Sequence, residues 1–171
     1  MMAQAAAPLR PTPLLRLERA AALVAALAVL GMMAVGTLDV LGTVLLGRPL
    51  SGAYEITESL MVAAVFLALA LSQREGRQIR VTLVVERLGP RMVAVLDALA
   101  ELASLGVYAV IAWYGWGVAI ESHAIGEFSS GLLRFPVWPA KLALALGATL
   151  MVVQCAAGSW LALRGRAVQA R

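Results

Sequence analysis

Four long apolar runs constrain this chain more than any other feature of its sequence. Three of them cover residues 20–47, 92–120 and 142–163; the second covers residues 59–72 and is extended to a span over residues 53–72. A helix that crosses the hydrocarbon core of a bilayer, about 30 Å thick, needs about 20 apolar residues. Of the 171 residues, 61% are hydrophobic and 14% are charged, against about 45–50% and about 25% in an average soluble domain. The sequence therefore predicts an all-α, polytopic membrane protein with four transmembrane helices in a single domain, residues 1–171.

Charged residues at the edges of these runs limit how the helices can be placed. If Ser51 caps the second helix, the span 53–72 reaches about 30 Å and holds Glu55 and Glu58 in its first turns, where carboxylates suit the helix dipole. The third run is about 43 Å long as one helix, so its start is expected to tilt or protrude. Asp39 lies about 28 Å along the first helix from Ala20, which places its carboxylate at the far surface.

The distribution of Lys and Arg predicts how the chain is oriented. The tail 1–19, the loop 73–91 and the tail 164–171 together hold 11 of the 14 basic residues, and the segments on the other side hold 3. Cytoplasmic loops carry the excess of Lys and Arg in membrane proteins. Both termini and the loop 73–91 are therefore predicted to be cytoplasmic, and the loop 121–141 is predicted to be periplasmic.

The loop 73–91 has a second property besides its positive charge. Its apolar residues Val81, Val84, Val85 and Leu88 fall on one face of a helical wheel. This pattern predicts a short interfacial amphipathic helix, between the second and third spans, that lies on membrane lipid; a solvated linker is the alternative. The segment has no aromatic side chain on which bases could stack, so we do not expect nucleic acid as a partner.

Polar residues on the third span form a candidate seam. Asp97, Glu101, Ser104 and Tyr108 lie on one face of the helix. Ionisable groups within a membrane are costly and are candidates for function. We interpret the seam as hydrogen-bonded to a neighbouring helix, to the adjacent arginines or to another subunit; a proton or ion relay is the alternative.

Other chemistry is not indicated by the sequence. Glu55 and Glu58 could hold a cation or perform acid–base work, but we expect them to stabilise the helix start, or to contact a partner. His123 lies near Glu121 and Glu127, a set that could in principle bind zinc, yet exposed residues of this kind are mostly solvated. No nucleophile, phosphate-loop or dinucleotide pattern is present. We therefore predict no catalytic residue, no cofactor and no metal.

Three stretches, in this order along the four spans, carry a family resemblance. The first is "REGRQIRVT", which resembles the pattern Arg-x-Gly-x-His-Ile-Arg-Val-Asp through Arg74, Gly76, Ile79, Arg80 and Val81, with Gln78 and Thr82 in place of the His and Asp. The others are "YEITESLMVAAVFLALA" and "SSGLLRFPVWPAKLALALGATLMVVQ". Together they resemble the small membrane subunit of tripartite ATP-independent periplasmic (TRAP) transporters, the DctQ family.

This resemblance implies a function. It implies a non-catalytic scaffold subunit in a bacterial inner membrane, whose partners are a large TRAP permease subunit and a periplasmic solute-binding protein. Uptake of a carboxylate-type solute would be coupled to sodium. Candidates for the subunit interface, or for a structural role, are Glu55, Glu58, Arg74, Gly76, Arg80, Asp97, Glu101, Arg134, Pro136 and Trp138.

Two other classes of protein are weighed against this one. A self-sufficient small four-helix exporter needs a membrane-embedded carboxylate that faces a central cavity, and Asp39 lies too near the outer surface for that role. A membrane enzyme or assembly factor needs a catalytic constellation, which the sequence does not show.

Overall fold

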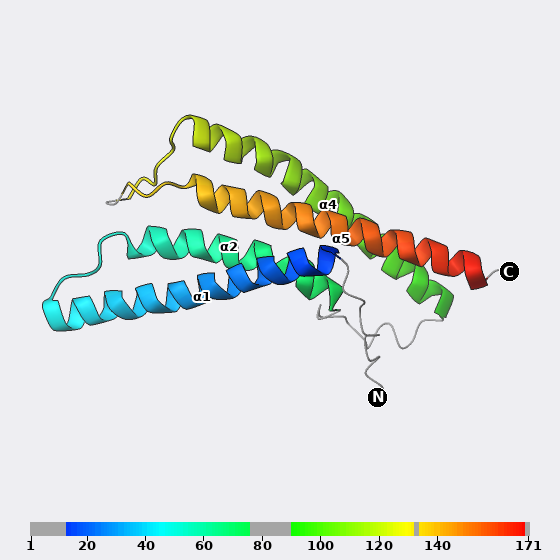
Figure 1. The fold of residues 1–171 in the computed structure, drawn as a ribbon, viewed down its shortest axis with the longest axis horizontal. Helices are drawn as coiled ribbons and strands as arrows, with labels where there is room; N and C mark the ends of the chain where they lie inside the picture. Colours follow the sequence, from blue (N-terminus) through cyan, green and yellow to red (C-terminus); the bar gives the residue numbers. More distant parts are fainter. Residues whose placement is uncertain (1–12, 76–89, 132–133, 170–171) are drawn as a thin grey trace.

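The computed structural model describes residues 13–75, 90–131 and 134–169, and these residues form four long helices (Figure 1). The helices are α1 Pro13–Leu46, α2 Ala53–Arg74, α4 Pro90–Ala124 and α5 Trp138–Gln169. Each contains a segment that is, by length and composition, long and apolar enough to cross a membrane, so the prediction of an all-α chain with four such helices is confirmed. The predicted interfacial helix falls within residues 76–89, outside the described residues.

Several helix ends differ from the limits of the apolar runs. α1 starts at Pro13, a residue that suits the first turn of a helix, and its 34 residues extend for about 51 Å. α5 starts at Trp138 rather than at residue 142. The expectation that Ser51 caps α2 is wrong, because Gly52 occupies the cap position with a φ of 82° and no side-chain cap hydrogen bond. Helices this long extend past a hydrocarbon core of about 30 Å, so the limits of the spans themselves stay predictions.

The helices pack side by side in a row, in the order α1–α2–α5–α4 (Figure 1). α1 and α2 form one antiparallel hairpin, and α4 and α5 form the other. The two hairpins are joined where α2 packs against α5. Along the helix axes the bundle has two ends. We call the end at which α1 begins and α5 ends the terminal end, and the opposite end, which carries the connections between α1 and α2 and between α4 and α5, the loop end.

Small residues line the contacts between the helices. Buried alanines lie on all four helices, for example Ala28 on α1, Ala70 on α2 and Ala148 on α5. At Gly147 of α5 an added Cβ would lie 2.8 Å from the Cβ of Phe66 on α2, and closer still to the Phe66 carbonyl group. Lipid tails are as apolar as leucine, so helices in a bilayer associate through close packing of this kind.

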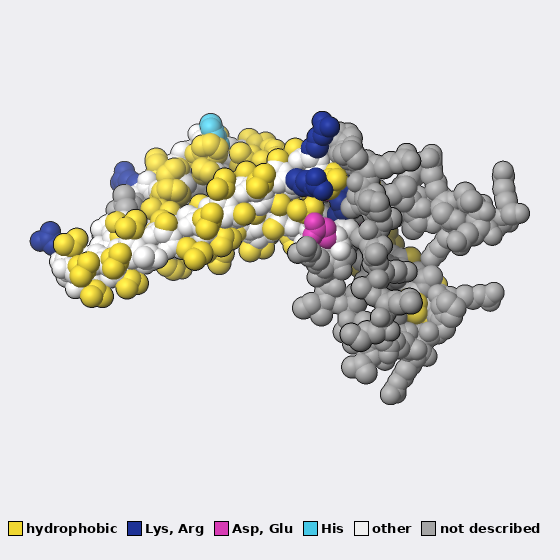
Figure 2. Space-filling view, turned by 60° about the horizontal axis from the view of Figure 1, so that its bottom comes forward, with side chains coloured by type: hydrophobic (Ala, Val, Ile, Leu, Met, Phe, Trp, Pro, Cys, Tyr) yellow, Lys and Arg dark blue, Asp and Glu magenta, His cyan; other side chains and the backbone are white. Residues whose placement is uncertain are grey.

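Large apolar side chains cover the outside of the row. Leu27 on α1 is 65% exposed and Trp113 on α4 is 80% exposed. Figure 2 shows a broad hydrophobic band with charged side chains gathered toward its two ends. This distribution matches a bilayer as the surrounding solvent.

Candidate functional site

A buried ion pair at the terminal end joins the start of α1 to the end of α2. Glu18 is fully buried, and Arg74 donates a hydrogen bond of 3.1 Å from Nη2 to Glu18 Oε1 in addition to the ionic contact. A buried carboxylate is costly unless it is paired, so each residue depends on the other. Arg74 was a candidate from the sequence, whereas Glu18 was missed because it was assigned to the tail 1–19. The sequence did hold one indication that Glu18 is unusual, because Glu18 is the only acidic residue before Asp39.

A second polar contact at the terminal end brings three helices together. Gln73 at the end of α2 donates a long hydrogen bond of 3.5 Å to Oε2 of the half-buried Glu101 on α4. On α5, an added Cβ at Gly158 would lie 2.9 Å from Oε1 of Glu101, so the carboxylate fits against a glycine. Asp97 also belongs to α4, but its side chain is not among those described. Gly76 and Arg80 lie outside the described residues as well.

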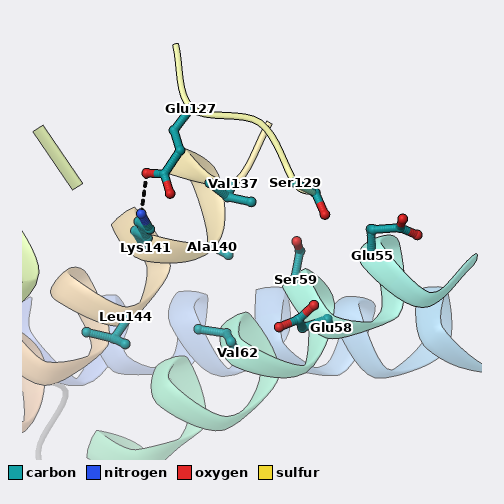
Figure 3. A pocket seen from close by; sticks show the side chains of 10 residues that line it. All are labelled: Glu55, Glu58, Ser59, Val62, Glu127, Ser129, Val137, Ala140, Lys141 and Leu144. Carbon is teal, nitrogen blue, oxygen red and sulfur yellow. Dashed lines mark hydrogen bonds and ion pairs between the residues drawn. The ribbon is translucent and has the colours of Figure 1, made fainter. Parts of the chain in front are cut away.

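At the loop end, a pocket of about 240 Å³ lies between α2, the loop 125–137 and the start of α5. Its lining combines polar and apolar side chains: Glu55, Glu58, Ser59, Val62, Glu127, Ser129, Val137, Ala140, Lys141 and Leu144. In Figure 3 Val62 of α2 points toward Leu144 of α5, whereas the carboxylate of Glu55 points away from α5. The loop that carries Glu127 and Ser129 passes above the two helices. We call this cavity the loop-end pocket.

The charges of the loop-end pocket are only partly paired. Lys141 forms an ion pair with Glu127 and donates a hydrogen bond to its carboxylate. This hydrogen bond holds the pKa of the Glu127 carboxyl below its usual range. Glu55 is 9% exposed and Glu58 is exposed. Within the described residues, neither of these two carboxylates has a hydrogen-bond or ionic partner.

Glu55 owes its burial to the loop. An added Cβ at Gly131 would lie 3.0 Å from Cγ of Glu55 and would overlap its carboxylate, so the loop backbone lies directly against this side chain. A side chain at position 131 would displace the carboxylate of Glu55 from its present position. The sequence showed Glu55 and Glu58 one turn apart on a helix; the loop that covers Glu55 and the pairing of Lys141 with Glu127 were not readable from it.

The remaining loop-end candidates lie in the loop or at the start of α5. Arg134 is exposed, and Pro136 forms an isolated bridge with Phe128 that holds the two arms of the loop together. Trp138 begins α5 and contacts His123 of α4 edge to face, with 5.0 Å between ring centroids. In the part of the chain that the structure describes, no three or more His, Cys, Asp and Glu side chains lie together as a group that could hold a metal ion.

Asp39 has a local role at the end of α1. Its Oδ1 accepts a hydrogen bond of 2.7 Å from the backbone N–H of Leu50. The carboxylate thereby satisfies a donor in the connection between α1 and α2, a connection that runs over residues 47–52. It is engaged in closing this loop, unlike the carboxylate that a self-sufficient exporter would need in a central cavity.

Comparison with known proteins identifies one family. Residues 32–165, most of the chain, match the family model described as tripartite ATP-independent periplasmic transporters, DctQ component. The match includes α2 and α4 in full and the greater part of α5. No curated protein matches the chain.

Proposed function

The chain belongs to the DctQ component family of TRAP transporters, and from this membership we propose that it is a small, non-catalytic subunit that scaffolds a large permease subunit. The large subunit carries the substrate and sodium sites, and a periplasmic solute-binding protein delivers the substrate. The complex takes up a carboxylate-type solute across the bacterial inner membrane, driven by the sodium gradient.

The arrangement of the helices in a row is the observation that supports a scaffold. The outer helices α1 and α4 are separated by the inner pair, so the described helices do not surround a common interior. A protein that moves a polar solute by itself needs a path lined by protein, because buried polar groups must be solvated or hydrogen-bonded. A row offers instead a broad apolar side on which a second membrane protein can pack.

Charge placement supports an orientation with the terminal end in the cytoplasm. Arg16, Arg19 and Arg74 lie at the terminal end, and the segments that the orientation assigns to the cytoplasm hold 11 of the 14 basic residues. The positive-inside rule relates this excess to the cytoplasmic side. The loop-end pocket, with its uncompensated carboxylates, then faces the periplasm.

Co-purification and reconstitution test the proposal together. A tagged copy of the chain is expressed with the large permease subunit of the same transporter, and the two are expected to purify as one complex. Vesicles that contain the complex and the binding protein should accumulate a carboxylate solute when a sodium gradient is imposed, and vesicles that contain this chain alone should not. Solute movement by the isolated chain would contradict the scaffold role.

A charge reversal in the basic loop tests whether its arginines do more than orient the chain. Arg80→Glu is expected to abolish assembly with the large subunit, whereas Arg77→Glu, at a variable position of the family pattern, is expected to leave it intact. The amount of large subunit recovered per tagged chain measures the difference. Equal recovery for both variants would reduce the segment to an orientation signal.

A further inference from the structure

Each of the four helices contains a charge-free stretch that has a charged residue at both ends. In α1 this stretch runs from Arg19 to Asp39 and in α4 from Glu101 to Glu121, a rise of about 30 Å in each helix. The corresponding stretches, Glu58 to Arg74 in α2 and Lys141 to Arg164 in α5, rise about 24 Å and about 35 Å. All four match a hydrocarbon core of about 30 Å, so their ends indicate where the two surfaces of a bilayer lie.

Side-chain contacts hold three of these boundary charges at one level across the terminal end. Glu18, the residue before Arg19, forms the buried ion pair with Arg74. Gln73, the residue before Arg74, donates its hydrogen bond to Glu101. The charge-free stretches of α1, α2 and α4 therefore end together, and a bilayer whose hydrocarbon fills them has its terminal surface at the level of the Glu18–Arg74 pair.

Two exposed arginines of α1 lie at this level, Arg19 beside the ion pair and Arg16 one helical turn farther out. Glu18 lies between them in the sequence, but its buried carboxylate is engaged by Arg74. Among the described residues, neither Arg16 nor Arg19 has a hydrogen-bond or ionic partner. Figure 2 shows basic side chains where the hydrophobic band meets this end of the bundle. Two positive charges are therefore open to a partner beside apolar surface.

A phospholipid matches both features of this surface. Its phosphate accepts hydrogen bonds from the guanidinium fork of an arginine, and its acyl chains can lie on apolar side chains such as Leu17 and Leu23, which are 55% and 67% exposed. A net negative charge is required, since the amine of a zwitterionic headgroup repels the same arginines. We infer that Arg16 and Arg19 bind the headgroup of an anionic phospholipid in the leaflet at the terminal end. This inference goes beyond the proposed function, from which it takes only the membrane as the surroundings.

Titration with single lipids tests the inference. The chain is purified in a nonionic detergent, stripped of lipid and mixed with dioleoyl phosphatidylglycerol or dioleoyl phosphatidylcholine, and native mass spectrometry measures the lipid bound at each concentration. The wild type is expected to bind phosphatidylglycerol more tightly than phosphatidylcholine. Arg16→Gln/Arg19→Gln should weaken phosphatidylglycerol binding about five- to thirtyfold, as expected for two arginines near anionic lipid, and should leave phosphatidylcholine binding unchanged. The matched control Arg48→Gln/Arg134→Gln removes two exposed arginines at the loop end and should bind phosphatidylglycerol as the wild type does.

Four results would overturn the inference. Equal affinity of the wild type for both lipids would remove the preference, and equal losses in the two double variants would reduce the effect to net charge. Displacement of phosphatidylglycerol by inorganic phosphate would identify a site for a soluble anion. Because both side chains are exposed, the thermal midpoint in lipid-free detergent should not change in Arg16→Gln/Arg19→Gln, and a lowered midpoint would make the arginines structural. The large permease subunit takes no part in these measurements, so failure of the proposed function would leave their result unchanged.

Discussion

Substitution of Gly147 should weaken the junction between the two helical hairpins. In Gly147→Ala the new methyl group would stand 2.8 Å from Cβ of Phe66, and nearer to its carbonyl group, whereas carbon atoms pack at about 3.5–4.0 Å. The α2 and α5 backbones would have to separate by about 1 Å at this point. Overpacking of this kind costs about 1–3 kcal/mol. Because α2 and α5 join the hairpins, the loss should affect the whole row.

Gly117→Ala provides the control, since an added Cβ at Gly117 in α4 meets nothing within 4 Å. Both substitutions replace a glycine within a helix by alanine and gain about the same helix propensity, roughly 1 kcal/mol. The difference between their free energies of unfolding therefore measures the cost of the clash with Phe66. Reversible unfolding of the two variants in detergent, followed by tryptophan fluorescence, should give Gly147→Ala a free energy of unfolding about 1–3 kcal/mol below that of Gly117→Ala. Equal stabilities would refute the close approach of α2 to α5.

Three further predictions concern the charged groups. Arg74→Ala should lower the free energy of unfolding by about 3–5 kcal/mol, because it leaves Glu18 buried without its cation. In a double-mutant cycle, adding Glu18→Gln should recover part of that loss. If the effects of the two substitutions on the free energy of unfolding simply add, the pairing is contradicted. The lowered pKa of Glu127 means that its contribution to stability is present above its ordinary pKa of 4.5 and is lost as the pH falls through the lowered value. The thermal midpoint should therefore drop on acidification below pH 4.5, less steeply in Lys141→Met, and an unchanged slope in that variant would argue against the ion pair. Asp39→Ala should cost about 1 kcal/mol by removing a loop hydrogen bond, while sodium-driven uptake by the complex continues; loss of uptake with normal assembly would point to a role for this carboxylate in transport.

The sequence determined the class of protein because membrane crossing is a local property. A run of about 20 apolar residues is long enough to cross the bilayer whatever the rest of the chain does, so the four runs by themselves predicted four spans. The family was readable for a related reason, since its motifs are contiguous stretches such as "REGRQIRVT". Glu55 and Glu58 were likewise visible as a pair, because residues one turn apart on a helix share a face.

The tertiary structure alone decided the order of the helices and the partners of the charged side chains. Transmembrane helices are apolar on most faces, so their periodicity does not say which face meets which neighbour. The pairing of Glu18 with Arg74, the cover that Gly131 places over Glu55 and the approach of Gly147 to Phe66 each join residues far apart in the chain. Such contacts depend on how the helices align in the row, which is set by close packing between small residues rather than by any local pattern.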